Sequence, residues 1–443
     1  MSVIADLRTV LVHRDFRKLF SVRLVSQCGD GMFQAGLATL FFFSPQNLAT
    51  AGAVAAAFAV LLLPFTIVGP FAGPLLDRWR RRQVLAVGNA IRVVLGLTLA
   101  VLMATQGVGP AVYVLALLTL GVNRFLLAAL SAGLPRVVPR EQLLMANTLT
   151  PTLGAVSAVA GAGLGFGIGW LVPAGPGKDG LVLATAAVLF GCAALLALRM
   201  GPDLLGPTRA ARTRGGFEAF SADVRATLRD LVDGAGYLIR RRTPGMALAV
   251  MALHRFLYGL NFIALILISR NLLSEPTDAG AGLAMFAVLT SISFAGNGLA
   301  IVATPIAHER MSPSTWIVVC LGLGAVSQIL MAAAPEFAVI AAAAVLMGLA
   351  VQGAKIAVDT IVQRDTHDSF RGRAFSLYDM LYNAAFAGAA ALAAAALPDT
   401  GWSRPVFAAL AVAYVVIAVA YRRGVRRVHD RPVPVLDGER TPV

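Results

Sequence analysis

The sequence carries little charge. Only 14% of its 443 residues are Asp, Glu, Lys or Arg, whereas soluble domains average about 25%. Hydrophobic residues account for 58% of the chain, and apolar runs of about 18 residues or more recur along it. This composition excludes an ordinary soluble domain and predicts an all-α polytopic membrane protein.

Residues typical of catalytic and metal sites are scarce or scattered. The three cysteines lie in apolar segments, and their odd number argues against a disulfide framework. The histidines show no metal-ligand spacing, and the sequence contains neither a phosphate-binding Walker loop nor a nucleophile elbow. We therefore expect no cofactor, no metal site, no ATP-driven transport and no enzymatic activity from this chain.

Acidic residues are outnumbered, with 23 Asp and Glu against 37 Lys and Arg, which gives a net charge of +14. This excess does not indicate nucleic-acid binding, because the basic residues crowd into alternate loops rather than onto a soluble domain. The loops on the opposite side hold only Lys178, Arg270 and Arg404. The positive-inside rule then predicts a plasma- or inner-membrane protein with both termini in the cytoplasm. Its first hydrophobic run is too long to be a cleavable signal peptide.

The apolar runs predict twelve membrane-spanning helices, each long enough for a hydrocarbon core of about 30 Å. They cover residues 18–43, 51–76, 84–105, 110–134, 144–172, 180–200, 244–270, 279–304, 313–334, 336–362, 371–397 and 402–422. The long loop at 201–243 divides them into two six-helix bundles, at 1–200 and 244–422, and a cytoplasmic tail follows at 423–443.

The long loop contains a helical pattern of its own. Apolar residues recur every three or four positions from Phe217 to Leu238, which predicts an amphipathic helix along the cytoplasmic surface. We interpret it as a strap between the two bundles; regulation or the docking of a partner is the alternative. Short basic connections at 135–147 and 363–375 each contain an acid and lie six helices apart, which favours a repeat of two halves.

The most specific motif lies between the second and third predicted helices. From Gly73 to Arg82 the chain is Gly-Pro-Leu-Leu-Asp-Arg-Trp-Arg-Arg-Arg. This stretch resembles the signature loop of the major facilitator superfamily, G-x-L-x-D-R-x-G-R-R/K. Arg80 replaces the glycine of that pattern, as in the drug, macrolide and siderophore exporters of the family. The alternative is a loop that serves only as a positive-inside anchor.

The resemblance covers essentially the whole chain as a twelve-helix topology. It implies the major facilitator fold, in which two pseudo-symmetric six-helix bundles rock around a midplane site in alternating access. It also implies a gating role for five residues of the loop. These are Gly73, Asp77, Arg78, Arg81 and Arg82.

Ionisable residues inside membrane spans are costly and point to function. Asp30 and Arg124 lie at similar depth in the first and fourth predicted helices, near the bilayer midplane, and we expect them to form an ion pair. Arg23 and Arg92 lie nearer helix ends and are expected to snorkel to the interface. Arg255 has no acid at its depth in its own half, so it faces the cavity or reaches towards Asp30.

The second half contains a further set of charges. Lys355 lies at the depth of Asp379, while Asp359, one helical turn away, is the competing partner. We predict that these two carboxylates, and Asp30 with Arg124, couple proton movement to transport, because a buried carboxylate releases its cation when it binds a proton. The alternative is that the pairs only fix helix packing.

Few polar residues are available to line a central cavity that is otherwise apolar. The candidates are Gln34, Asn123, Arg255, Tyr258, Asn261, Gln352, Lys355 and Tyr378. Their basic excess favours anionic or zwitterionic amphiphiles as substrates. Glycines of the fifth predicted helix match an antiporter signature only in part, and close helix packing explains them equally well.

We therefore predict a monomeric secondary transporter that exports an amphipathic drug, siderophore or lipid-like molecule in exchange for protons. Its partners would be that substrate, protons and membrane lipid. Two alternatives stay open: a proton-coupled importer of a small nutrient, and a lipid-handling or non-transporting membrane scaffold on the same fold.

Overall fold

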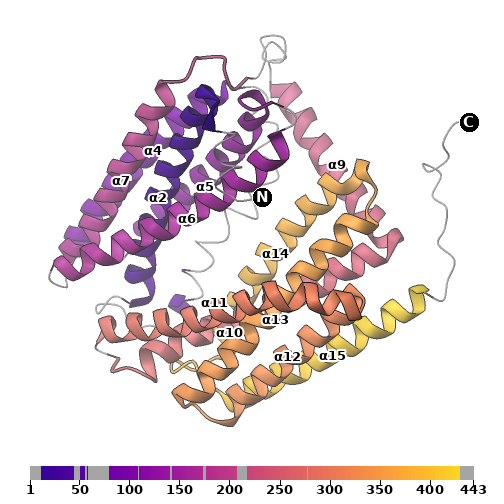
Figure 1. The fold of residues 1–443 in the computed structure, drawn as a ribbon. Coiled ribbons are helices and arrows are strands. Elements are labelled where there is room, and N and C mark those ends of the chain that lie inside the picture. Colours follow the sequence, from indigo (N-terminus) through magenta and orange to yellow (C-terminus); the bar gives the residue numbers. More distant parts are fainter. Residues whose placement is uncertain are drawn as a thin grey trace, which may run out of the picture. The chain divides into compact units, whose positions relative to one another are not determined.

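The computed structural model describes residues 11–43, 50–54, 57, 79–107, 109–139, 142–172, 176–206, 217–276 and 278–429. Within these ranges all regular structure is helical (Figure 1). The chain forms two compact units, one of Met1–Arg229 with Thr277–Leu283 and the other of Asp230–Pro276 with Ala284–Val443. Each unit is described separately below.

Five α-helices and one short 3-10 helix of the first unit have defined bounds. They are α2 (Arg14–Phe43), α4 (Arg81–Gln106), α5 (Pro110–Gly133), η1 (Leu134–Arg136), α6 (Leu143–Leu171) and α7 (Pro176–Leu198). The boundary between the units falls inside α9 (Phe217–Arg241). The helices that follow are α10 (Thr243–Asn271), α11 (Ala279–Arg310), α12 (Pro313–Ala333), α13 (Phe337–Asp365), α14 (Asp368–Ala396) and α15 (Arg404–His429).

Ten helices in the described ranges are long and apolar enough to cross a membrane. α2 is not among these ten, but its 30 residues are long enough to cross a hydrocarbon core of about 30 Å. The helix predicted at 51–76 lies mostly outside the described residues, although 51–54 are helical. The prediction of an all-α polytopic membrane protein is confirmed, and a count of twelve spans fits these helices.

Proline sets the start of several helices. Pro110, Pro244 and Pro313 each occupy the first turn of a helix, where the missing N–H has no intrahelical partner to lose. At α12 the Ser312 hydroxyl also accepts a hydrogen bond from the Thr315 amide at 3.3 Å, which satisfies one of the free amides of the first turn. The helix starts therefore follow from local sequence.

The same helix pairs pack in both units. In the first unit α2 packs against α6 and α7, and α4 packs against α5 and α7. In the second unit α10 packs against α14 and α15, and α12 packs against α13 and α15 (Figure 1). Taken in chain order, α10, α12, α13, α14 and α15 repeat the partners of α2, α4, α5, α6 and α7. This agrees with the predicted repeat of two halves.

Glycine allows close helix crossings in each unit. A β-carbon at Gly161 of α6 would overlap the backbone of Cys28 in α2, and one at Gly348 of α13 would overlap the backbone of Ser293 in α11. Small residues let helix backbones approach where bulkier ones cannot. By contrast, a β-carbon at Gly163 would meet no atom within 4 Å. Close packing therefore explains part of the glycine row in this helix.

The amphipathic helix predicted in the long loop is present as α9. Near its end the Tyr237 ring stacks on Phe370 of α14, with 4.3 Å between the ring centroids. The Tyr237 hydroxyl accepts a hydrogen bond from the His367 amide at 3.1 Å, and Asp230 pairs with Arg373 at 2.7 Å. The C-terminal part of α9 is therefore anchored to the start of α14.

Candidate functional site

A buried ion pair joins α2 to α4 in the first unit. The Arg92 guanidinium binds the Asp30 carboxylate, and the exposed fractions of the two residues are 0% and 2%. Arg92 also donates to the Ser26 hydroxyl at 3.2 Å and to the Asn89 side-chain oxygen at 3.4 Å. The Phe190 ring of α7 covers the guanidinium, with its centroid 3.5 Å away. An ion pair this deep is stable only because these contacts replace water.

The predicted ion pair between Asp30 and Arg124 is wrong. The structure places Arg92, and not Arg124, against the carboxylate, and Asn123 of α5 lies beside it. α4 begins at Arg81, three residues before its predicted start at 84, so Arg92 lies almost one turn deeper than expected. The expectation of snorkelling is also wrong, because a buried guanidinium does not reach the interface; Arg23 is likewise buried.

Three of the predicted gating-loop residues, Gly73, Asp77 and Arg78, lie outside the described residues. Arg81 and Arg82 lie within them. The Arg81 guanidinium donates to the carbonyl of Ala132 at 3.0 Å and to that of Leu205 at 3.1 Å.

Arg82 donates to the Leu198 carbonyl at 2.9 Å. Carbonyls at helix C-termini lack intrahelical donors and attract cations. The two arginines therefore tie the start of α4 to the ends of α5 and α7.

Replacing Arg81 by glutamine is expected to lower the free energy of unfolding by about 1–3 kcal/mol, because hydrogen bonds from a charged donor are lost. Arg80→Gln is the matched control. Arg80 pairs with Asp203 at 3.2 Å, and more than half of the Asp203 side chain is exposed, so its loss should cost below about 1 kcal/mol. Thermal unfolding of both variants in detergent checks the order. Equal losses would show that the carbonyl contacts of Arg81 contribute nothing.

Lys355 in the second unit pairs with Asp359, its predicted competing partner, at 2.7 Å within α13. The ion pair of Lys355 in the structure is with Asp359 and not with the other predicted partner, Asp379 of α14. Asp379 is exposed, and its backbone carbonyl accepts a hydrogen bond from Asn383. Residues one turn apart on a helix meet without any constraint from packing, so the local pair forms.

Arg255 of α10 lies among three aromatic rings. Its guanidinium carbon is 4.2 Å from the ring centroid of Tyr382, 4.4 Å from that of Phe386 and 5.0 Å from that of Tyr258. The faces of aromatic rings attract cations at these distances. The Arg255 Nε is buried and has no hydrogen-bond partner among the described residues. Part of the hydrogen-bonding capacity of Arg255 is therefore unused within the described residues.

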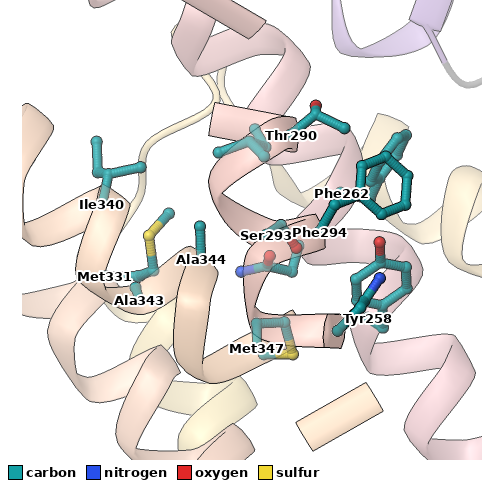
Figure 2. Close-up of a pocket in the computed structure, with 13 residues that line it drawn as sticks. Tyr258, Phe262, Thr290, Ser293, Phe294, Met331, Ile340, Ala343, Ala344 and Met347 are labelled. Atoms are coloured by element: carbon teal, nitrogen blue, oxygen red, sulfur yellow. The ribbon is translucent and has the colours of Figure 1, made fainter. Parts of the chain in front are cut away.

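A pocket lies beside these aromatic rings, between α10, α11, α12 and α13, and Tyr258 belongs to both (Figure 2). Its polar lining comes from two helices and includes two of the predicted cavity residues. The polar residues are Tyr258, Asn261, Thr290, Ser293 and Asn297. Its apolar lining is Phe262, Leu265, Phe294, Met331, Ile340, Ala343, Ala344 and Met347. The Thr290 hydroxyl is buried without a hydrogen-bond partner among the described residues, so the pocket can accept a polar group.

Sequence reasoning missed the three polar residues of α11. Thr290, Ser293 and Asn297 follow the i, i+3, i+7 spacing of one helix face, and that signal was available in the sequence. The other predicted cavity residues do not line this pocket. Gln34 is exposed on α2, Gln352 is half-buried on α13, and Tyr378 is buried on α14.

Comparison with known proteins gives one family. The model of the Major Facilitator Superfamily matches residues 247–442. Uncharacterized MFS-type transporters of Mycobacterium bovis and Mycobacterium tuberculosis are each 34% identical over 423 residues, which cover 94% of this chain and 93% of the relative.

Solved structures agree on the fold. The peptide transporter POT matches with a TM-score of 0.67 at 14% identity, over 93% of this chain and 95% of its own. The nucleoside transporter NupG matches with a TM-score of 0.59 at 16% identity, over 92% of this chain and 98% of its own. At such identities the likeness shows the fold and not the substrate.

Proposed function

The chain belongs to the Major Facilitator Superfamily, and on that premise we propose that this membrane transporter exports amphipathic small molecules in exchange for protons. Alternating access of the two halves would carry the substrate across the membrane. The observation that carries the proposal is the buried Asp30–Arg92 pair.

The pair has the properties that proton coupling requires. An ionised carboxylate in an apolar interior needs a cation beside it, and protonation removes that need. One Asp30 oxygen binds Arg92, while the other, Oδ2, is buried and has no hydrogen-bond partner among the described residues. Gln27 and Asn123 are the other side chains that interact with this carboxylate, so a proton on Oδ2 would compete with neutral amides and not with the bond to Arg92. Arg92 would then rely on Ser26 and Asn89, and the contact between α2 and α4 would weaken.

Asp359, with Lys355, is a second candidate for coupling in the second unit. About a quarter of the Asp359 side chain is exposed and about a third of that of Lys355. Asp359 Oδ1 is also buried without a hydrogen-bond partner among the described residues, but water reaches the rest of the pair. A proton on Asp359 would therefore change the packing less than one on Asp30. We assign the principal coupling role to Asp30 for this reason.

The second unit supports an amphipathic, anionic substrate. Arg255 offers a cation that the aromatic rings hold in place, and the neighbouring pocket offers apolar surface with a few hydroxyl and amide groups. Small-molecule sites combine such features, with a mostly apolar lining and a few polar groups that fix orientation. The pocket holds only about 40 Å³ in this structure, so an amphiphile would enter it only after the surrounding helices move apart. Arg255 favours carboxylated or zwitterionic amphiphiles over permanent cations.

A proteoliposome assay tests the proposal. Purified wild type and Asp30→Asn are reconstituted, an inside-acidic pH jump is applied to inverted vesicles, and uptake of carboxylated, zwitterionic and permanently cationic amphiphiles is followed. We expect the jump to drive uptake of the anionic and zwitterionic compounds by wild type, and Asp30→Asn to stay near the level of empty vesicles. Asp233→Asn, which removes an exposed carboxylate, should behave as wild type.

Other outcomes decide against parts of the proposal. An inside-acidic jump drives uptake by proton exchange, so uptake that instead requires an outside-acidic jump would identify proton symport and therefore an importer. A wild type that moves no compound in either orientation would favour the scaffold alternative. Strict preference for permanent cations would contradict the anionic substrate.

A further inference from the structure

We propose that a basic pocket at one end of the first unit binds the headgroup of an anionic phospholipid. The pocket lies where α2 begins and α7 ends, and these two helices pack against each other. Its lining is Arg14, Arg17, Lys18, Ser21, Leu196 and Arg199. Nothing in the proposed transport cycle uses these residues. Asp30 is sixteen residues along α2 from Arg14, about 24 Å at the helical rise.

The positive charge of the pocket is only partly compensated. Lys18 pairs with Asp15 at 3.0 Å. Arg17 is held by the Leu11 carbonyl at 3.0 Å, a contact that orients its guanidinium without neutralising it. Within the described residues the structure records no ion pair for Arg14 or Arg199. Three guanidinium groups therefore stand around one concavity with no matching carboxylate in the part of the chain that the structure describes, which is an arrangement that recruits phosphate.

A stripe on α7 indicates that the phosphate belongs to a lipid. Val188, Cys192 and Leu195 follow i, i+4, i+7 spacing and so share one face of α7. Arg199 comes directly after the last residue of this helix, Leu198. Val188 and Leu195 are 62% and 66% exposed, and Cys192 is also exposed. The face is thus apolar along its length and ends in an arginine at the pocket. An acyl chain along this face would place its headgroup among the arginines, whereas a free phosphate would use only the basic end.

The location matches the physics of anionic lipids. Basic residues near a membrane surface attract anionic headgroups, and pockets between helix ends at the membrane face add directed hydrogen bonds to this attraction. A headgroup held here would touch the ends of α2 and α7 together. It would therefore stabilise the packing of these two helices.

Binding of short-chain lipid to the full chain in neutral detergent tests the proposal. The probe is fluorescent dioctanoyl phosphatidylglycerol, and the competitors are phosphatidylcholine of equal chain length and inorganic phosphate. The test variant is Arg14→Gln/Arg17→Gln/Arg199→Gln. The matched control, Arg422→Gln/Arg423→Gln/Arg426→Gln, removes the same charge from exposed positions on α15.

We expect wild type and control to bind phosphatidylglycerol about tenfold or more tightly than phosphatidylcholine, and the test variant to lose that preference. Inorganic phosphate at equal concentration should not displace the lipid. Leu195→Asn should weaken the binding of phosphatidylglycerol although it leaves every arginine of the pocket in place. Equal loss in test and control variants would reduce the effect to net charge and overturn the proposal. Displacement by phosphate at equal concentration would identify a free-anion site and overturn it as well. If the triple variant does not fold, Arg199→Gln with Arg422→Gln as control gives the same comparison.

Discussion

Asp30→Leu is expected to abolish gradient-driven transport and to lower the free energy of unfolding by about 3–5 kcal/mol, because it leaves Arg92 buried without its counter-ion. Arginine keeps its charge in proteins, so the variant cannot relieve the cost by deprotonation. Arg92→Met should destabilise less, since the lone Asp30 carboxyl can take up a proton and become neutral. Both variants are expected to lose coupling.

The double variant Asp30→Leu/Arg92→Met separates the two roles of the pair. Apolar residues of similar volume often replace a buried ion pair with little loss of stability, so the double variant should unfold within about 1 kcal/mol of wild type. It has no titratable group at the site, so proton-driven uptake should remain at background. Thermal unfolding in detergent and pH-jump uptake measure the two effects. Recovery of both stability and uptake would reduce the pair to helix packing.

Gly161→Val is expected to prevent recovery of folded protein. The added β-carbon would overlap the Cys28 backbone, and a backbone cannot rotate aside as a side chain can. Overpacking a core costs about 1–3 kcal/mol and sometimes more; here α2 and α6 must separate along their crossing.

Gly163→Val is the matched control on the same helix, because a β-carbon there meets no atom within 4 Å. It should give a monodisperse peak on size-exclusion chromatography at wild-type yield. Equal yields of the two variants would mean that α2 and α6 do not cross as closely as described.

Most helices could be predicted from hydropathy because their ends coincide with a change in composition. α10 was predicted at 244–270 and spans Thr243–Asn271, and α12 was predicted at 313–334 and spans Pro313–Ala333. In both, proline at the first turn follows a polar segment. The starts of α2 and α4 were placed too late by four and three residues, since both begin at arginines, Arg14 and Arg81. Arginine is a good helix former, and a charge at the membrane face does not end a helix.

The buried pair shows what sequence leaves undetermined. Counting residues gives depth along a helix, and it placed Asp30 near the middle of its span. It gives neither the rotation of each helix nor the identity of its neighbours, so depth alone favours Arg124 over Arg92. The contact between Lys355 and Asp359 was among the predicted alternatives because it needs only the geometry of one helix. The aromatic rings around Arg255 include Tyr382 and Phe386 of α14. Only tertiary packing brings these two rings next to α10.

The two halves pack alike but differ in the polar group that they bury. In the first unit α2, α4 and α7 enclose Asp30 and Arg92 beneath Phe190. The corresponding helices of the second unit, α10 and α15, bring His254 and Tyr414 together, with ring centroids 5.4 Å apart. A repeat can thus keep its helix contacts while one copy carries a charged pair. This asymmetry is a second reason, besides the exposure of Asp359 and Lys355, to assign the proposed coupling to the first half.

The central claim is that protonation of Asp30 drives the transport cycle, and one comparison tests it most directly. Substrate exchange without a gradient and substrate accumulation under a pH gradient are measured in the same proteoliposomes for wild type and Asp30→Asn. Asparagine keeps the shape of the side chain and an oxygen for Arg92, but it cannot take up a proton. The account predicts that Asp30→Asn still exchanges substrate and no longer accumulates it. Accumulation by Asp30→Asn at the wild-type level would contradict the account.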